Sequence, residues 1–162
     1  MKGSALLLAL LLMLLLWLMV GCTTLAAQEP VRPVPDVASW ATAFAMPSIA
    51  AWHAARSADP KCKFAQLAIS EAIGNVAVLS LKHWVVSPRP CLGCAADGFP
   101  SGHSMNSVIG LSSGWRVGLF LAIGTGELRD VAQRHTKTQI AAGLALGGLA
   151  EWAGQRLVRC RS

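Results

Sequence analysis

Apolar residues recur along this chain at helical spacing, and prolines, glycines and polar clusters divide them into a few long segments. The first segment predicts a helix over 37–56, with Asp36 as its cap. The second predicts a helix over about 61–86 that ends before Pro88. No alternating pattern typical of a strand competes with these segments. The expected fold class is therefore all-α.

Two further helices are expected in the second half of the chain. Ser101 is a good cap for the start of one of them, and the last covers about 136–158. Gly143 and Gly147 lie four residues apart in that last helix, on one face, which allows close helix packing. Together the segments predict a compact bundle of about five helices. Five tryptophans are expected to pack in its core or at its interfaces: Trp40, Trp52, Trp84, Trp115 and Trp152.

The start of the chain differs in character from the rest. Lys2 is followed by an apolar run over residues 5–20, which is shorter than the roughly 20 residues of a spanning helix. This layout is typical of an export signal. The stretch before Cys22 resembles a bacterial lipobox, with Met19 where Leu is usual. Residues 1–21 are interpreted as a lipoprotein signal peptide and Cys22 as the lipidated residue. A plain secretory signal and an uncleaved membrane anchor are the alternatives.

The mature chain divides into a tether and one domain. Residues 22–35 contain three prolines and little apolar content, which predicts an extended tether, and 36–162 form the helical domain. No charge-free window in 58–162 approaches the roughly 18 residues of a membrane span. Residues 37–55 are free of charge, but Pro47 interrupts them. A globular bundle tethered by lipid is therefore favoured over a polytopic membrane protein.

Composition and charge limit the expected partners. The chain is 54% hydrophobic, so the domain can bury a sizeable core, and its formal net charge is +6. A basic chain suits anionic partners. Nucleic acid is not expected, because an exported chain does not meet it and no basic recognition helix is present. Thr23 stands where an Asp commonly retains lipoproteins in the inner membrane. We therefore expect a lipoprotein of the outer membrane that faces the periplasm.

Candidate chemistry is concentrated in three short motifs. They are Lys82 and Arg89-Pro90 with six residues between, Pro100-Ser101-Gly102-His103, and Arg129 and His135 with five residues between. A phosphoryl group in transfer spreads its charge over three oxygens, so its catalysis needs preorganised donors. The lysine is a point charge, the arginines are planar forks, and the serine and glycine offer neutral donors at a helix start. This collection predicts a phosphate site.

These motifs resemble those of the type 2 phosphatidic acid phosphatase (PAP2) family, which also includes bacterial acid phosphatases and vanadium haloperoxidases. The resemblance covers roughly residues 60–155, and the first two motifs match completely. It implies a shortened PAP2-type helical bundle in which His135 is the nucleophile, forming a phosphohistidine, and His103 is the general acid. Neither a metal nor a cofactor is implied, although vanadate could mimic phosphate in the pocket. The implied substrate-binding residues are Lys82, Arg89, Ser101, Gly102 and Arg129.

The third motif departs from the family pattern at two positions. Leu128 stands where the family has Ser, and Gln139 stands where it has an Asp beside the nucleophile. Gln139 can accept the N–H of the His135 ring, but it brings no charge to stabilise the imidazolium. Asp130 or Glu127 could supply that charge instead.

The expected site also constrains the path of the chain. A straight helix over 101–125 would be about 37 Å long. Its length would carry Arg129 to the far end from His103, with few residues left for the chain to return. We therefore expect a break near Ser112-Ser113-Gly114.

The cysteines follow from the same topology. Five are present, and assigning one to lipid leaves four, which can form two disulfides in three connectivities in an oxidising compartment. The second helix ends at the site and the last begins there, so Cys62 and Cys160 lie at the opposite end and are the preferred pair. Cys91 and Cys94 then form a small bridge in the loop over the site. A reduced redox pair and a zinc site with His103 are the alternatives.

The predicted function is hydrolysis of a phosphate monoester or pyrophosphate. A lipid phosphate is favoured, because the first helix is expected to run antiparallel to the second and the tether then leaves at the active-site end. The alternatives are a non-catalytic phosphate-binding or structural envelope lipoprotein and a vanadate-dependent peroxidase. Basic residues gather at the opposite end, as a solvated face or a surface for an anionic partner: Arg56, Lys61, Lys63, Arg156, Arg159 and Arg161.

Overall fold

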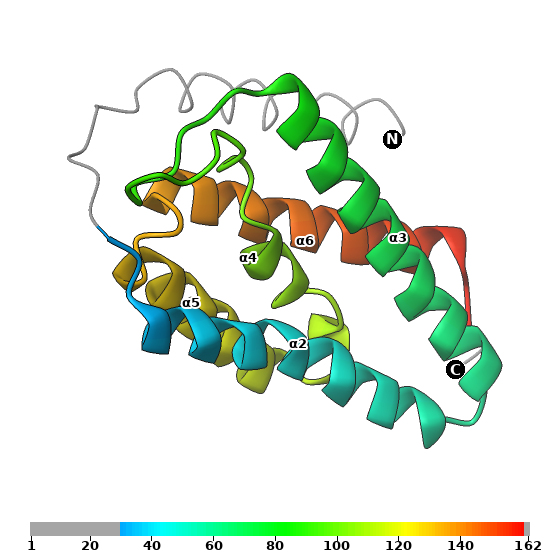
Figure 1. Ribbon diagram of the computed structural model, residues 1–162. Helices are drawn as coiled ribbons and strands as arrows, with labels where there is room; N and C mark the ends of the chain where they lie inside the picture. The colour runs from blue at the N-terminus through cyan, green and yellow to red at the C-terminus, as the bar shows by residue number, and fades with distance from the viewer. Residues whose placement is uncertain (1–29, 161–162) are drawn as a thin grey trace.

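Residues 30–160, the part of the chain that the computed structural model describes, contain five α-helices and one short 3₁₀ helix (Figure 1). Within these residues no strand is present, which confirms the all-α bundle of about five helices. The signal peptide, Cys22 and most of the tether lie outside the described residues. The helices are α2 (Pro33–Ala55), α3 (Pro60–Trp84), α4 (Gly102–Asn106), α5 (Trp115–Val131) and α6 (Lys137–Leu157), and η1 is the 3₁₀ helix (Leu111–Ser113).

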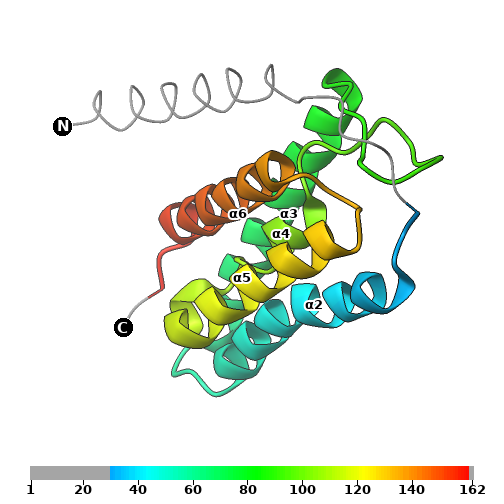
Figure 2. The same cartoon turned by 90° about the vertical axis from the view of Figure 1, so that its left-hand side faces the viewer.

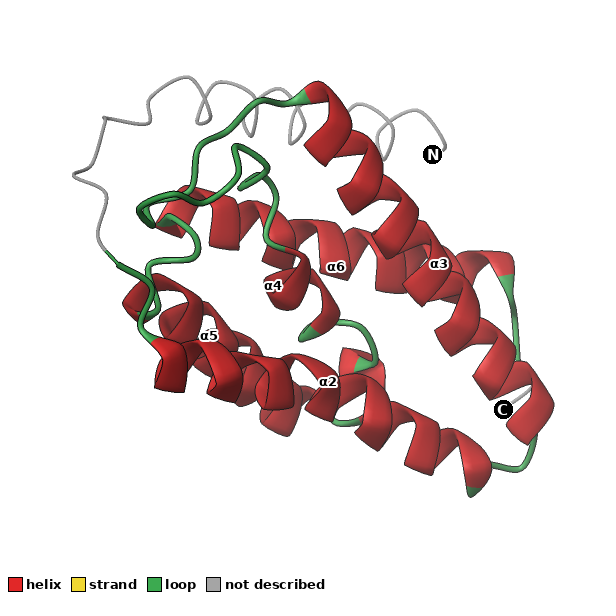
Figure 3. Cartoon of the chain, in the orientation of Figure 1, coloured by secondary structure: helices red, strands yellow, loops and turns green. Residues whose placement is uncertain are grey.

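The four long helices form two pairs around the short one. α3 packs mainly against α6 and α2 mainly against α5, while α4 lies between them and contacts all four (Figures 1 and 2). α2 and α6 begin at the same end of the bundle, where α3 and α5 end. The loops that adjoin the three motifs gather at this end, as Figure 3 shows, and we call it the site end.

The start of α2 differs from the prediction. The helix begins at Pro33 with Arg32 as its N-cap residue, so Asp36 lies in the first turn and does not cap it. Prolines at 33 and 35 are compatible with a first turn, because the N–H groups they lack have no partner there. The earlier start frees the Asp36 carboxylate for another use at the site. Pro47 lies inside α2, which continues past it to Ala55.

The expected break after α4 is confirmed. α4 ends at Asn106, and Gly110 takes a left-handed conformation with φ 95° before η1. A Cβ atom at Gly110 would lie 2.5 Å from the Cβ of Ala50, so only glycine fits this turn. The Glu151 carboxylate of α6 holds the break, because it accepts hydrogen bonds from the Gly110 N–H at 2.9 Å and the Ser112 hydroxyl at 2.6 Å.

Close packing of α4 on α6 depends on the predicted glycine pair. A Cβ atom at Gly143 would collide with the carbonyl oxygen of Ser101, and one at Gly147 with that of Met105. Met105 lies in the core of the bundle, where it packs with Val78 of α3. The small residues of α6 therefore set the position of the helix that carries His103.

Both predicted disulfides are present. Cys62 at the start of α3 is bonded to Cys160, which follows α6 at the end remote from the site. Cys91 is bonded to Cys94 in the loop between α3 and α4. One disulfide thus closes each end of the bundle.

The tryptophans do not pack in the core, which was one of the two places expected for them. Instead of packing in the core, all five expose between 51% and 80% of their surface: Trp40, Trp52, Trp84, Trp115 and Trp152. The inward faces of α2 and α6 consist largely of Ala, Gly and Ser, so the backbones approach closely and leave no room for large rings. Among the described residues, α3 is the one helix that is long and apolar enough to cross a membrane, by length and composition.

Candidate active site

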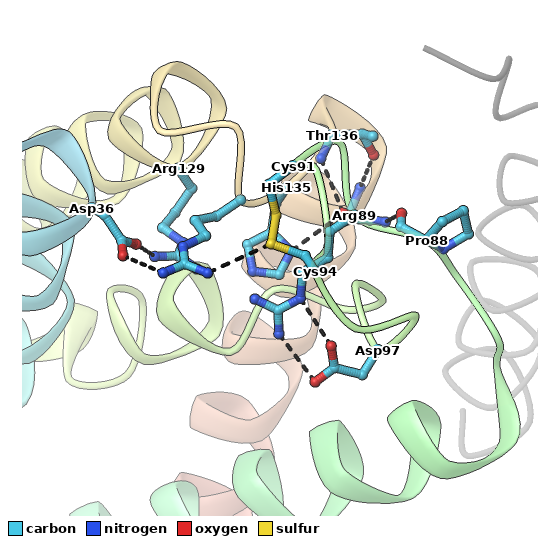
Figure 4. The surroundings of a disulfide bond; sticks show 11 residues. Asp36, Pro88, Arg89, Cys91, Cys94, Asp97, Arg129, His135 and Thr136 are labelled. Atoms are coloured by element: carbon cyan, nitrogen blue, oxygen red, sulfur yellow. Dashed lines mark hydrogen bonds and ion pairs between the residues drawn. A yellow bond between two sulfur atoms is a disulfide. The ribbon is translucent and has the colours of Figure 1, made fainter. Parts of the chain in front are cut away.

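Residues from every predicted motif meet at the site end. The last turn of α3 supplies Lys82, the following loop supplies Arg89, and α4 carries His103. Arg129 lies in the last turn of α5, and His135 lies just before α6. Figure 4 shows the His135 ring between two ion pairs, one made by Arg89 and one made by Arg129.

Asp97 binds two cations, Arg89 and Lys82. The Arg89 guanidinium donates from Nε and Nη2 to the two carboxylate oxygens of Asp97, at 2.9 and 3.1 Å. Lys82 Nζ lies 3.8 Å from one of these oxygens and also donates to the Asp97 backbone carbonyl. Burial raises the pKa of Asp97, but the Arg89 hydrogen bond and the two cations outweigh it and hold the pKa below its ordinary value. The Asp97 carboxylate thus already pairs with two cations that were predicted to bind phosphate.

Asp36 binds two other cations, Arg129 and Arg134. Arg129 Nη1 donates to one carboxylate oxygen at 2.5 Å and to the Ser39 hydroxyl acceptor at 3.1 Å. Arg134 Nη2 donates to the other oxygen at 2.7 Å, and its Nη1 lies 3.7 Å from the Cys94 sulfur. This network connects α2, α5 and the disulfide loop. The sequence did not predict Asp97 and Asp36 as partners of these cations, or Arg134 as part of the site. None of the three lies in a motif whose spacing indicates an ion pair.

His135 is held by a backbone carbonyl. Its Nδ1 lies 2.8 Å from the Gly98 carbonyl oxygen, which can only accept, so Nδ1 carries the proton and Nε2 carries the lone pair. The Gln139 side-chain oxygen is a second, longer contact of Nδ1 at 3.3 Å. Burial, followed by the charges of Arg129 and Arg89, lowers the pKa of His135 to about 2. The imidazole is therefore neutral and in the tautomer that a nucleophile needs.

Gln139 ties the start of α6 to the segment after α3. Its side-chain oxygen accepts the Thr136 N–H at 3.0 Å in a capping box, and its amide nitrogen donates to the Ser87 hydroxyl and the Pro88 carbonyl, both at 2.9 Å. The backbone carbonyl of Ser87 in turn accepts a hydrogen bond from the Gly98 N–H at 2.7 Å. Gln139 therefore helps to place the Gly98 carbonyl that orients His135.

Neither Asp130 nor Glu127 is among the hydrogen-bond partners given for His135 in the described chain. The hydrogen bonds given for His135 in the described chain go to Gly98, Gln139 and, through its own backbone N–H, to the Arg129 carbonyl. A backbone carbonyl leaves no trace in a side-chain motif, so sequence reasoning had no signal for it.

Replacing Gln139 by Asp, the residue of the family pattern, is expected to give no gain in turnover. The shorter side chain loses both donors, to Ser87 and to Pro88, and the free energy of unfolding should fall by about 1–3 kcal/mol. Gln139→Glu is the matched control, since it also replaces the amide by a carboxylate and loses the donors, but keeps the length of the side chain. Denaturation midpoints and kcat of the three proteins test this, and a tenfold rise of kcat in Gln139→Asp would contradict it.

His103 presents a free ring nitrogen. Its ring packs edge-on against Trp40, with 4.1 Å between centroids, and its Nε2 is buried with no hydrogen-bond partner in the described structure. Burial, then the charge of Arg129, lowers the pKa of His103 to about 4, while Asp36 acts in the opposite direction. The ring is therefore neutral near pH 7 before a ligand binds.

Ser101 serves as the cap of α4, as predicted. It is fully buried, and its hydroxyl oxygen accepts from the Ser104 N–H at 3.4 Å and the Ser104 hydroxyl at 3.0 Å. Its second predicted use, as a phosphate ligand with the Gly102 amide, stays a prediction.

Comparisons with protein-family models, with curated proteins and with solved structures gave no match. Within residues 30–160 no cluster of three or more His, Cys, Asp or Glu side chains suited to a metal ion is found. What converges is one neutral histidine with a free Nε2, a second histidine with an unpaired ring nitrogen, and four cations.

Proposed function

We propose that the protein is a PAP2-type phosphatase that hydrolyses a phosphate monoester or pyrophosphate, with a lipid phosphate as the favoured substrate. The observation that carries the proposal is the state of His135. Its Nδ1 proton is bound by the Gly98 carbonyl, which leaves Nε2 as a nucleophile beside the cations of Arg89 and Arg129.

The reaction has two balanced steps. Nε2 of His135 attacks phosphorus, the bond from phosphorus to the leaving oxygen breaks, and that oxygen takes a proton from His103. Water then attacks the phosphohistidine and gives a proton to His103, so phosphate leaves and both histidines return to their first state. Lys82, Arg89 and Arg129 stabilise the charge on the three equatorial oxygens throughout. A bound phosphate dianion also offsets the cations that lower the pKa of His103, which favours its protonated form.

Substrate and Asp97 compete for the same cations in this proposal. Asp97→Asn removes the competing charge but keeps the shape of the side chain. Because Asp97 is 44% exposed, the expected gain is modest, about fivefold tighter inhibition by orthophosphate. Inhibition constants for wild type and variant measure it. A weaker inhibition in the variant would mean that Asp97 positions Arg89 and Lys82 instead of competing with phosphate.

The rate should rise toward acid pH. The reaction needs neutral His135 and protonated His103. With a pKa of about 2, His135 stays neutral above that pH, whereas His103, with a pKa of about 4 in the free protein, loses its proton as the pH rises. We therefore expect kcat/KM to fall with increasing pH above about 4, since this ratio reports the free enzyme. A ratio that is constant from acid to neutral pH would contradict the role of His103.

Phosphate release from a panel of substrates tests the proposal itself. Lipid phosphates, lipid diphosphates and water-soluble monoesters are offered to the full chain in detergent, with His135→Ala as the control. Release by the wild type that the variant lacks supports the enzyme, and faster release from lipid substrates supports the substrate class. If the two proteins are indistinguishable, the enzyme is excluded.

One observation favours a second candidate, a non-catalytic phosphate-binding lipoprotein. Asp36 and Asp97 already pair with Arg89, Arg129 and Arg134, so these cations have counter-ions without a substrate. Such a protein would bind orthophosphate and release none from any ester of the panel.

A further inference from the structure

Large apolar side chains point outward from all four long helices. Val76 and Leu79 on α3 are 64% and 67% exposed, and Phe120 and Ile123 on α5 are 79% and 56% exposed. α2 and α6 expose Phe44 and Leu157 in the same way. Single exposed apolar residues are ordinary, but a soluble monomer rarely exposes them together over every long helix. Each of the four long helices therefore exposes large apolar side chains.

The inward surface has the opposite character. Buried positions of α2 include Ala43 and Ala50, and those of α6 include Gly143, Gly147 and Gly154. Small residues inside and large apolar residues outside are typical of helices that associate within a membrane, where burial of large side chains provides no driving force. In a water-soluble bundle the large side chains would fill the core. The sidedness of these helices thus favours lipid as the surrounding medium.

The lengths of α2, α3 and α6 match a bilayer, whereas α5 with 17 residues is shorter. α2, α3 and α6 have 23, 25 and 21 residues, which correspond to roughly 31–37 Å at 1.5 Å per residue, against about 30 Å of hydrocarbon. α3 is apolar enough to span, yet only 17% of its most apolar window is buried in the protein. The charged side chain in the middle of α3 is Glu71, which is half-buried and accepts a hydrogen bond from Asn75.

Tryptophan and arginine mark the ends of this apolar surface. At the end remote from the site, the guanidinium of Arg56 lies 3.9 Å from the ring centre of Trp52, and that of Arg156 lies 5.6 Å from Trp152. Trp84 lies at the site end of α3. Tryptophans concentrate at both water interfaces of a membrane, and basic side chains complement its anionic headgroups.

We propose that the outward faces of α2, α3, α5 and α6 contact the acyl chains of a bilayer, so that the bundle spans the membrane with the phosphate site at one interface. This goes beyond a lipid tether and does not depend on turnover. A second copy of the chain would cover one face, so it does not cover all four helices. A spanning bundle places Cys62–Cys160 and Cys91–Cys94 on opposite sides. Because disulfides persist in oxidising compartments, both sides must be oxidising, as they are for an outer membrane.

Quenching of tryptophan fluorescence by brominated phospholipids tests the proposal. The full chain carries Trp17→Leu, which removes the tryptophan outside the described residues, and is reconstituted in vesicles with bromines on the acyl chains or in the same vesicles without bromine. We expect the remaining fluorescence to fall at least about twofold in brominated vesicles, because tryptophans at the interfaces contact acyl chains. Equal fluorescence in the two vesicles would overturn the proposal, whether water, a second copy or residues 5–20 cover these faces.

Lysine substitutions provide a second, independent measurement. Val76→Lys and Phe120→Lys put a charge in the middle of the outward faces, and Ala58→Lys puts the same charge in the loop between α2 and α3. In a bilayer the first two should lower the ratio of folded to unfolded protein at least about tenfold. Ala58→Lys should leave this ratio unchanged. If all three variants fold as well as the wild type, the outward faces lie in water and the proposal fails.

Discussion

Replacing His135 by Ala is expected to lower the rate of phosphate release by at least about 10⁴-fold, since the step that forms the phosphohistidine then has no nucleophile. The His135 side chain is 2% exposed and already oriented by the Gly98 carbonyl, so no neighbouring group can take its place without a rearrangement. The measurement is phosphate release under saturating substrate, for wild type and variant at the same pH.

Two controls make this result specific. His53→Ala changes an exposed histidine near the remote end of α2 and should keep the full rate. Orthophosphate binding to His135→Ala should persist, because Lys82 and Arg89 remain. Loss of release together with retained binding locates the defect in the chemical step. A His135→Ala protein that releases phosphate at the wild-type rate would contradict the assignment.

Asp36→Ala should cause the largest loss of stability among single substitutions at the site. It leaves Arg129, whose side chain is 4% exposed, as a buried charge without its counter-ion, and it also removes the partner of Arg134. Breaking a buried pair in this way lowers the free energy of unfolding by about 3 kcal/mol. Denaturation of both proteins under the same detergent and salt conditions measures the difference.

Asp59→Ala is the matched control for Asp36→Ala. Asp59 is an exposed carboxylate that caps α3 through the Cys62 N–H at 3.1 Å, so its loss should cost only about 1 kcal/mol. If Asp36→Ala destabilises the protein no more than Asp59→Ala, the ion pairs of Asp36 contribute little and Arg129 must find another partner.

Much of the fold was predictable from local signals. Apolar spacing identified α2, α3 and α6, with prolines at the boundaries of the first two, and Ser101 identified the start of α4. The break after α4 and the pairing of Cys62 with Cys160 followed from the requirement that His103, Arg129 and His135 share one end. Each of these signals lies in the residue types themselves or in a distance that the chain must cover.

Two kinds of feature were not predictable. The expectation that tryptophans pack in the core was wrong. The small inward residues and the large outward residues of α2 and α6 are both apolar, so the sequence shows no periodic contrast that tells one face from the other. The partners of the predicted site residues were missed for a different reason. Gly98 acts through its backbone carbonyl, and Asp97 and Asp36 become partners of cations only once the chain has folded.

The central claim is that His135 carries the phosphoryl group during turnover, and trapping this intermediate tests it most directly. The full chain is mixed briefly with a radiolabelled phosphate substrate and quenched in alkali, and the labelled peptide is mapped. The account predicts an acid-labile, alkali-stable label on His135 that is absent from His135→Ala. A protein that turns over substrate with no label on His135, or with the label on another residue, would contradict it.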